Sequence, residues 1–349
     1  MASYPKLEAL CIFLLFLSFA LPSTAEQRQR QCESKYKGRC HNKAQALNLK
    51  IIATVSILVA SMLGVCLPLF TRTVPAFHPD KDLFLVVKAF ASGVILATGY
   101  MHVLPDSFDD LKSPCLNENP WKKFPFTTFV AMLSALMTLM VDSFAMSYCT
   151  KHTSKVDINE RGVLSNTVED GHGKFSKNVD EMDEKSSELL RNRVVAQVLE
   201  MGIVVHSVVI GVAMGASNNP CTIRPLIAAL CFHQLFEGLG VGGCLLQAEY
   251  GRKMKAMMVL FFSGTTPIGI VLGIGLSNHV YSETSPTALI VVGLLNACSA
   301  GLLNYMALVD LLAADFMGPK LQASPKLQMW AYVAVLLGVG GMSLMAKWA

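Results

Sequence analysis

Long apolar stretches separated by short polar segments dominate this chain. A helix of about 20 apolar residues crosses the hydrocarbon core of a bilayer, which is about 30 Å thick. Eight stretches after the first 25 residues reach this length, at 48–70, 84–104, 125–148, 194–216, 224–247, 256–278, 287–312 and 327–347. Because a helix satisfies its own backbone hydrogen bonds in lipid, the pattern predicts an all-α integral membrane protein with eight transmembrane helices.

The N-terminal segment has a different pattern, which is typical of a cleavable secretory signal peptide. Lys6 precedes the apolar run Leu10–Leu17, and small residues up to Ala25 offer a cleavage site. An uncleaved first membrane anchor is the alternative that the same run permits. We predict a signal peptide over residues 1–25 and an extracytoplasmic tail over residues 26–47.

The longest polar segment divides the apolar pattern into two parts. Residues 149–193 mix positive and negative charge and contain no apolar run long enough to pack. Such a composition is typical of disordered segments. We therefore predict a flexible cytosolic loop between transmembrane helices one to three, within residues 48–148, and helices four to eight, within residues 194–349. Its two scattered histidines, His152 and His172, are more simply solvated than metal-binding.

Basic residues are distributed unevenly among the connections between these helices. If the mature N-terminus lies outside, most of them fall in cytosolic connections, and the outside connections carry only Lys112, Lys122, Lys123 and Arg224. This distribution fits the positive-inside rule. The basic N-terminal tail opposes the rule, and a signal peptide resolves the conflict because the tail that follows it is translocated.

Composition narrows the functional classes. The chain is 52% hydrophobic and 15% charged, whereas soluble domains carry about 25% charged residues. A net charge of +4 is too weak to indicate a nucleic-acid partner. Neither a nucleotide-binding loop nor a His-Glu-x-x-His run is present. These features argue against a directly ATP-driven pump and against an enzyme, and they indicate no resident cofactor.

Cysteine positions agree with this orientation. The predicted topology places Cys32, Cys40, Cys115 and Cys221 outside the cytosol, where disulfides persist. Four cysteines can pair in three ways, and the sequence does not choose among them.

Ionisable residues inside a membrane are costly, so each one is a functional candidate. The densest set lies on the fourth and fifth predicted helices, as His206, His233 and Glu237. With a rise of about 1.5 Å per residue, His206 lies about 18 Å from the inner end of its helix and His233 about 13 Å from the outer end of the next. Because a short connection makes the two helices antiparallel neighbours, both histidines should reach the bilayer midplane together.

The residue types at this depth favour a divalent transition metal. Glu237 follows His233 by four residues, so both side chains share one helix face. Imidazole nitrogen and carboxylate oxygen suit zinc and similar ions. The alternative is that these groups bond to one another and hold the helices together. Ser207 and Gln234 are candidate weak ligands or supporting partners, and Glu200 is a candidate exit ligand or structural partner.

Further polar residues suggest a path to and from this depth. His102 and Asp106 end the second predicted helix and either collect cations at an entrance or form an ordinary solvated helix end. Asp142, near the inner end of the third helix, either marks the exit or pairs with Lys88, and the same alternatives hold for Asp310 and Asp315. Pro267 is predicted to interrupt the sixth helix, as in transporters whose broken helices line the substrate cavity.

The stretches His206–Gly211, Cys221–Gly238 and Gly93–Asp106 resemble the signature of the ZIP (Zrt/Irt-like) metal transporters, in particular their plant branch. The resemblance covers everything after the signal segment except the polar loop. It implies a ZIP-type bundle of eight helices with both termini outside and inward movement of zinc or related ions. Alternating access, with one helix bundle sliding against another, and a homodimer are also implied.

The resemblance also implies roles for individual residues. His206, His233 and Glu237 match the primary metal ligands, and Ser207 and Gln234 match positions that contribute to a neighbouring second metal site. Some relatives have acidic residues at Ile210, at Gln234 and near Thr266, and their absence here predicts a single tightly held ion. His102 and Asp106 are implied to help metal enter, and Asp142 is implied to influence selectivity.

These observations together predict a divalent metal transporter that carries zinc into the cytosol, with iron(II), manganese(II) and cadmium(II) as open alternatives. A membrane metal sensor or receptor that binds without transport, and an intramembrane metalloenzyme, are the competing functions. A signal peptide leads to the plasma membrane or, alternatively, to an endomembrane or the vacuolar membrane.

Overall fold

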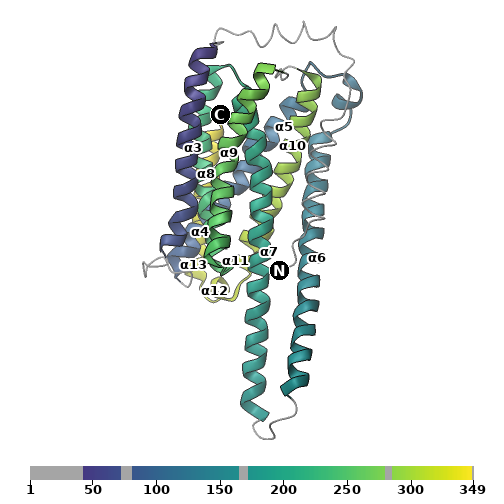
Figure 1. The fold of residues 1–349 in the computed structure, drawn as a ribbon, viewed down its shortest axis with the longest axis vertical. Coiled ribbons are helices and arrows are strands. Elements are labelled where there is room, and N and C mark those ends of the chain that lie inside the picture. The colour runs from purple at the N-terminus through teal and green to yellow at the C-terminus, as the bar shows by residue number, and fades with distance from the viewer. Residues whose placement is uncertain (1–41, 72–80, 165–171, 280–284, 348–349) are drawn as a thin grey trace.

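The computed structural model describes residues 42–71, 81–164, 172–279 and 285–347, and every regular element in these ranges is helical (Figure 1). The elements are α3 (Lys43–Thr71), α4 (Asp82–Thr98), η2 (Gly99–Val103), α5 (Leu104–Leu111), η3 (Glu118–Lys122), α6 (Phe126–Leu164), α7 (His172–Ala216), α8 (Pro220–Gln247), α9 (Arg252–His279), α10 (Pro286–Tyr305), η4 (Met306–Ala313), α11 (Ala314–Phe316), α12 (Pro319–Gln322) and α13 (Pro325–Ala346).

The prediction of eight membrane-spanning helices is confirmed. Eight helical segments of the described chain are long and apolar enough to cross a bilayer. The second span extends from Asp82 to Leu111, seven residues beyond the predicted end at residue 104. Its π-helical turn η2 and the short helix α5 continue the span past Pro105. The predicted signal peptide and Cys32 and Cys40 lie outside the described residues.

Helical segments occupy most of residues 149–193, where the sequence predicted a flexible cytosolic loop. Helix α6 continues to Leu164 and α7 begins at His172, so both helices project well beyond the rest of the bundle (Figure 1). The segment contains no proline, and its part after His172 is rich in glutamate and lysine, which favour helix even where nothing apolar requires it. The polar segment therefore ends the apolar pattern, but α6 and α7 both extend into it.

Three spans begin with the same local signal, a capping residue followed by proline. The side chain of Asn219 accepts a hydrogen bond from the Cys221 amide at 3.0 Å, and Ser285 accepts one from the Ala288 amide at 3.1 Å. Ser324 does the same at the start of α13. Such caps satisfy otherwise unpaired amides, and proline in the first turn loses no helical hydrogen bond.

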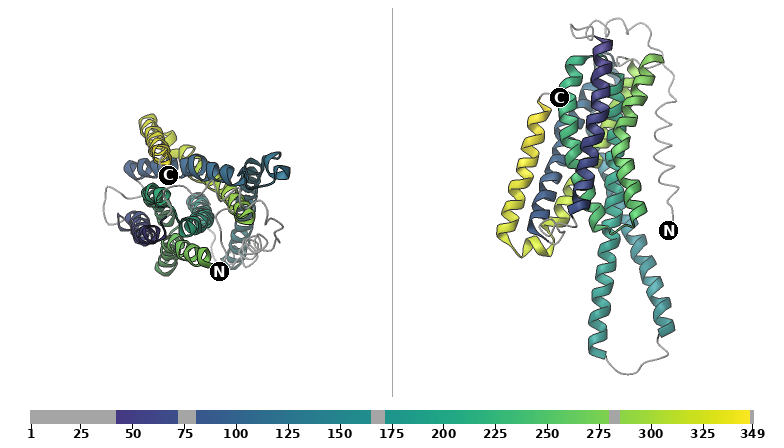
Figure 2. Two further views of the ribbon diagram at one scale, coloured as in Figure 1. Left: turned by 90° about the horizontal axis from the view of Figure 1, so that it is seen from above. Right: turned by 60° about the vertical axis from the view of Figure 1, so that its left-hand side comes forward.

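The spans pack as two groups of helices. In the first helix group, α3 packs along α8 and α7 along α9, with further contacts between α3 and α9 and between α7 and α8. In the second helix group, α4 packs along α13 and α6 along α10, and α5 also contacts α10. Figure 2 shows α13 at one edge of the molecule beside α4, far from α9. Neighbours in sequence are therefore not always the closest neighbours in space.

Glycines allow backbones to approach closely within each group. A Cβ at Gly211 would lie 2.7 Å from the Thr266 carbonyl oxygen and 3.0 Å from the Gly269 Cα, so α7 and α9 touch through glycine. A methyl group at Gly64 of α3 would collide with the carbonyl of Leu235 on α8. Small residues at such crossings are a known means of helix association in lipid.

Contacts between the two groups are of another kind. A Cβ at Gly240 would meet the side-chain Cδ1 of Ile95 at 3.1 Å, and one at Gly341 would meet the ring of Phe232 at 3.3 Å. At these positions side-chain ends, rather than backbones, face the opposite group. Such an interface can shift by rotating side chains, whereas the crossings at Gly64 and Gly211 have no flexible atoms to move.

The prediction that Pro267 interrupts the sixth span is wrong. Helix α9 runs without a break from Arg252 to His279 and contains Pro267 in its interior. Proline removes one backbone donor and crowds the carbonyl one turn earlier, but the packing of α9 against α3 and α7 keeps the helix continuous.

Candidate metal centre

Three buried side chains converge between α7 and α8. Each of His206, His233 and Glu237 offers one ligand atom, and these atoms all lie within 4.8 Å of one another. His206 is 1% exposed, and His233 and Glu237 are fully buried. We refer to these three residues as the metal centre.

Local structure explains why the three meet. The connection Ser217–Asn219 reverses the chain, and the Asn219 cap starts α8 at Pro220. His206 lies ten residues before the end of α7 and His233 thirteen residues after the start of α8, so both lie about 15–20 Å from the turn along the helix axes. The four-residue spacing on α8 then brings Glu237 to the face that carries His233.

The polar atoms of the metal centre have no partners among the described residues. Both ring nitrogens of His206 and of His233, and both carboxylate oxygens of Glu237, are buried without a hydrogen bond. Leaving a buried polar group unsatisfied costs about 1–3 kcal/mol. The alternative in which these groups bond to one another is therefore wrong for the described structure.

The arrangement fits a divalent metal ion. Ligands that surround zinc tetrahedrally at about 2.0–2.2 Å lie about 3.3 Å from one another. Small rotations of side chains that start within 4.8 Å of one another would reach this geometry. Three protein ligands also leave one position for water, which is typical of sites that exchange what they bind.

Other buried polar atoms on α7, α8 and α9 also lack partners among the described residues. The Ser207 hydroxyl, the Gln234 amide nitrogen and the Thr266 hydroxyl are all buried without a partner among the described residues. Ser207 and Gln234 each follow a metal-centre histidine in sequence, and their role as weak ligands or supporting partners stays a prediction. Glu200 is 8% exposed with an unpaired Oε1, and it lies about 9 Å from His206 along the axis of α7.

A third histidine lies against the metal centre. The ring centroid of His102 is 5.9 Å from that of His233, and the ring centroid of His206 is 5.6 Å from that of His233. His102 is 4% exposed, and its Nε2 has no partner among the described residues. The sequence placed His102 at an entrance, which stays a prediction, but it did not reveal this contact with His233.

The π-helical turn η2 carries His102. Proline cannot donate to the preceding turn, and its ring crowds the carbonyl four residues earlier. Pro105 stands two residues after η2, and the widened turn over Gly99–Val103 accommodates it. Such turns occur often at functional sites. A histidine three residues before a proline in an apolar span is the sequence signal that could have placed His102 nearer the centre.

Asp106 and Asp142, the other residues of the predicted metal path, lie on α5 and α6. Asp106 is half-buried on α5, one turn beyond His102. Asp142 on α6 accepts a hydrogen bond from the Tyr305 hydroxyl at 3.2 Å. Asp142 therefore contacts the helix that carries Asp310, whose Oδ2 is buried without a partner among the described residues.

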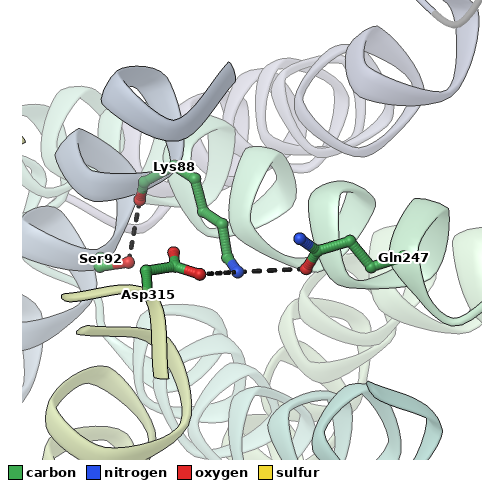
Figure 3. A network of polar contacts seen from close by, with 4 residues as sticks. All are labelled: Lys88, Ser92, Gln247 and Asp315. Atoms are coloured by element: carbon green, nitrogen blue, oxygen red, sulfur yellow. Dashed lines mark hydrogen bonds and ion pairs between the residues drawn. The ribbon is translucent and has the colours of Figure 1, made fainter. Parts of the chain in front are cut away.

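Lys88 has a different partner from the one suggested for Asp142. Its ammonium group donates to Asp315 Oδ1 at 2.9 Å and to Gln247 Oε1 at 3.1 Å (Figure 3). The Lys88–Asp142 alternative is therefore wrong, and Asp315 is the residue that forms the ion pair. We refer to Lys88, Asp315 and Gln247 as the Lys88 cluster.

Two of the four cysteines predicted outside the cytosol, Cys115 and Cys221, are disulfide-bonded. Cys66, Cys231, Cys244 and Cys298, which lie within spans, are free thiols. This division agrees with the predicted orientation of the spans.

Comparison with known proteins connects the fold to transport. The family model described as ZIP Zinc transporter matches residues 47–346. Zinc transporter 7 of Arabidopsis thaliana is 58% identical over 358 residues, covering 97% of both chains. Fe(2+) transport protein 2 of Oryza sativa subsp. japonica is 59% identical over 329 residues, covering 89% of both. Fe(2+) transport protein 1 of Arabidopsis thaliana is 56% identical over 343 residues, covering 98% of both.

Proposed function

The chain belongs to the ZIP zinc transporter family, and from this premise we propose that it carries zinc into the cytosol through the metal centre of His206, His233 and Glu237. It is a multi-pass membrane protein and a metal transporter rather than an enzyme. The observation that carries the proposal is the convergence of three buried ligand groups with no partners among the described residues. A metal ion would supply the partner that each of them lacks.

Alternating access is the mechanism that the packing supports. The metal centre belongs entirely to the first helix group, through α7 and α8. Backbones interlock at the glycine crossings within a group, whereas side-chain ends meet between the groups at Gly240 and Gly341. The first group can therefore move as a unit against the second and carry the bound ion past it.

His102 is the group of the second helix group that faces the bound ion. Its ring lies beside His233, and Asp106 follows one turn closer to the outer end of the span. Asp106 would attract the cation electrostatically, and His102 would pass it to His233. On the other side, Glu200 and Asp142 supply oxygen ligands for release toward the end from which α6 and α7 project.

Iron(II) is a second candidate substrate. Relatives named for Fe(2+) transport are as similar to this chain as Zinc transporter 7 is. A site of two imidazoles and one carboxylate binds several first-row divalent ions, and affinity alone does not identify the physiological one. Zinc remains our first choice because it readily accepts a tetrahedral site of mixed nitrogen and oxygen ligands.

Labelled-zinc uptake into zinc-uptake-deficient yeast tests the proposal. Wild type is compared with Glu237→Ala at matched surface expression, and with Glu118→Ala, which removes an exposed glutamate outside the bundle core. We expect saturable uptake by wild type and Glu118→Ala and none by Glu237→Ala. Competition by iron(II), manganese(II) and cadmium(II) ranks the substrates. Full uptake by Glu237→Ala would show that the metal passes elsewhere.

Two finer proposals concern the cellular context. The predicted signal segment supports delivery to the plasma membrane, and family membership supports a homodimer. Surface biotinylation of intact cells and cross-linking in native membranes test them. Protein found only in internal membranes, or only as a monomer, would contradict the respective proposal.

A further inference from the structure

The Lys88 cluster lies at the end of the bundle from which α6 and α7 project. Gln247 is the last residue of α8, ten residues after Glu237, and so about 15 Å from the metal centre along the axis. Lys88 lies in the second turn of α4, and Asp315 lies in α11 near the end of the seventh span. All three therefore occupy the same level, below the metal centre on the side of the projecting helices.

A polar cavity of about 80 Å³ adjoins the cluster. Side chains from both helix groups line it, among them Arg191, Cys244 and Gln247 of the first group and Lys88, Asp310 and Asp315 of the second. Gln247 and Cys244 of α8 line this cavity, ten and seven residues beyond Glu237 on the same helix.

The bonds of Lys88 differ in what they connect. Asp315 belongs, like Lys88, to the second helix group, whereas Gln247 belongs to the first. Polar contacts from Arg193 to the Ala248 carbonyl and from Tyr250 to the Arg193 carbonyl stay within the first group, and the ion pair between Lys320 and Asp82 stays within the second. The hydrogen bond from Lys88 to Gln247 therefore connects the two helix groups, and we refer to it as the tie between the groups (Figure 3).

We propose that the Lys88 cluster closes this end of the translocation path, and that metal leaves when the bond between Lys88 and Gln247 breaks. This proposal rests on the transport function proposed above. Breaking the bond to Gln247 leaves the ion pair with Asp315 intact, so opening exposes no unpaired buried charge, which would be strongly unfavourable.

Cys244 reports on the state of this closure. It lines the same cavity, is 3% exposed and is a free thiol. The experiment measures how fast a membrane-impermeant thiol reagent labels Cys244 in permeabilised cells without added zinc, with the labelled peptide identified by mass spectrometry. Gln247→Leu removes the acceptor of the tie between the groups. The control Gln322→Leu removes an exposed glutamine whose hydrogen bond to the Phe316 carbonyl stays within the second group.

We expect the reagent to label Cys244 roughly tenfold faster in Gln247→Leu than in wild type, which is the effect of losing one hydrogen bond to a charged group. In Gln322→Leu we expect the same labelling rate as in wild type. Gln247→Glu replaces the amide with a carboxylate, so the tie becomes an ion pair, and both Cys244 labelling and metal uptake should slow below wild type. Equal labelling of Cys244 in wild type and Gln247→Leu would overturn the proposal. So would unchanged labelling in Gln247→Glu, which tests the same tie if Gln247→Leu does not fold.

The labelling readout separates this proposal from the transport proposal. Labelling of Cys244 requires no metal movement, so altered labelling in the Gln247 variants supports the closure even where wild type takes up no zinc. Normal zinc uptake with unchanged labelling in the variants overturns the closure and leaves the transport proposal standing.

Discussion

The metal centre and the Lys88 cluster are both buried, polar and ionisable, yet they differ in whether their polar atoms have hydrogen-bond partners. In the Lys88 cluster, the ammonium group of Lys88 has oxygen partners at 2.9 and 3.1 Å from two other helices. In the metal centre, all six ligand atoms of the two histidines and the glutamate lack a partner among the described residues. The polar atoms of the Lys88 cluster bond to one another, whereas those of the metal centre are free to bind a group that is not part of the chain.

This difference shows how a buried polar residue in a membrane protein can be interpreted. A charge with internal partners contributes to folding, and removing one partner exposes the cost of burying the other. Polar groups without partners lower stability, and we propose that those of the metal centre persist because they bind the transported ion. The comparison therefore predicts opposite consequences for stability and for transport when each cluster is disrupted.

The largest expected effect is on transport through the metal centre. We expect His206→Ala to lower zinc uptake by at least about 100-fold, because even substitutions that only support a ligand cost 10–100-fold in metal affinity. The measurement is labelled-zinc uptake at matched surface expression. His152→Ala, on the projecting part of α6, serves as the matched histidine control and should retain wild-type uptake.

Removing Lys88 should have the largest effect on stability. Lys88→Met leaves the carboxylate of Asp315, whose side chain is 16% exposed, without its cationic partner, and we expect a loss of about 3 kcal/mol in the free energy of unfolding. Thermal unfolding of detergent-solubilised protein measures the change. The double variant Lys88→Met/Asp315→Leu removes both charges and should recover most of the loss. A double variant as unstable as Lys88→Met would contradict the assignment of the ion pair.

Zinc should stabilise the protein through the metal centre alone. At a free zinc concentration 100 times the dissociation constant, wild type should gain about 2.7 kcal/mol. Glu237→Ala should gain almost nothing, and Lys88→Met should keep the full increment although its starting stability is lower. The same thermal unfolding assay, with and without zinc, measures all three. An undiminished zinc effect in Glu237→Ala would place the binding site elsewhere.

The smallest expected effect has the opposite sign to that of Lys88. Glu237→Met replaces a buried carboxylate that has no partner among the described residues with an apolar side chain of similar length. We expect the metal-free protein to become more stable by about 1 kcal/mol, since the cost of an unsatisfied buried group is removed. Lower stability of metal-free Glu237→Met than of wild type would show that Glu237 has a structural role.

The sequence predicted much of the fold because the physics of a membrane span is local. Apolar length located all eight spans, and the four-residue spacing of His233 and Glu237 placed both on one face of α8. Prediction from the sequence failed where the local pattern and the final structure disagree, after residue 149 and at Pro267. The polar composition after residue 149 suggested a loop, but α6 continues to Leu164 through a proline-free segment. Pro267 suggested a break, but α9 continues through it and packs against α3 and α7.

The candidate site was predicted in part for the same reason. The short turn between α7 and α8 makes these helices antiparallel neighbours, and the ligand atoms of His206 and His233 lie within 4.8 Å of each other. His102 was placed at an entrance, because the charged residues after Pro105 ended the apolar pattern before the helix ended. Its ring lies beside His233 because η2 and α5 prolong the span to Leu111.

The sequence by itself determined the spans, their capped starts and the register of the ligands on α8, since each depends on neighbours within a few turns of one helix. Only the tertiary structure decided that α3 packs along α8 and α7 along α9, and that Lys88 pairs with Asp315, 227 residues away. The physical reason is that lipid is as apolar as the side chains it surrounds, so hydrophobicity does not choose partners among the spans. Shape at the glycine crossings and the need to satisfy each buried polar group make that choice, and both depend on residues far apart in the chain.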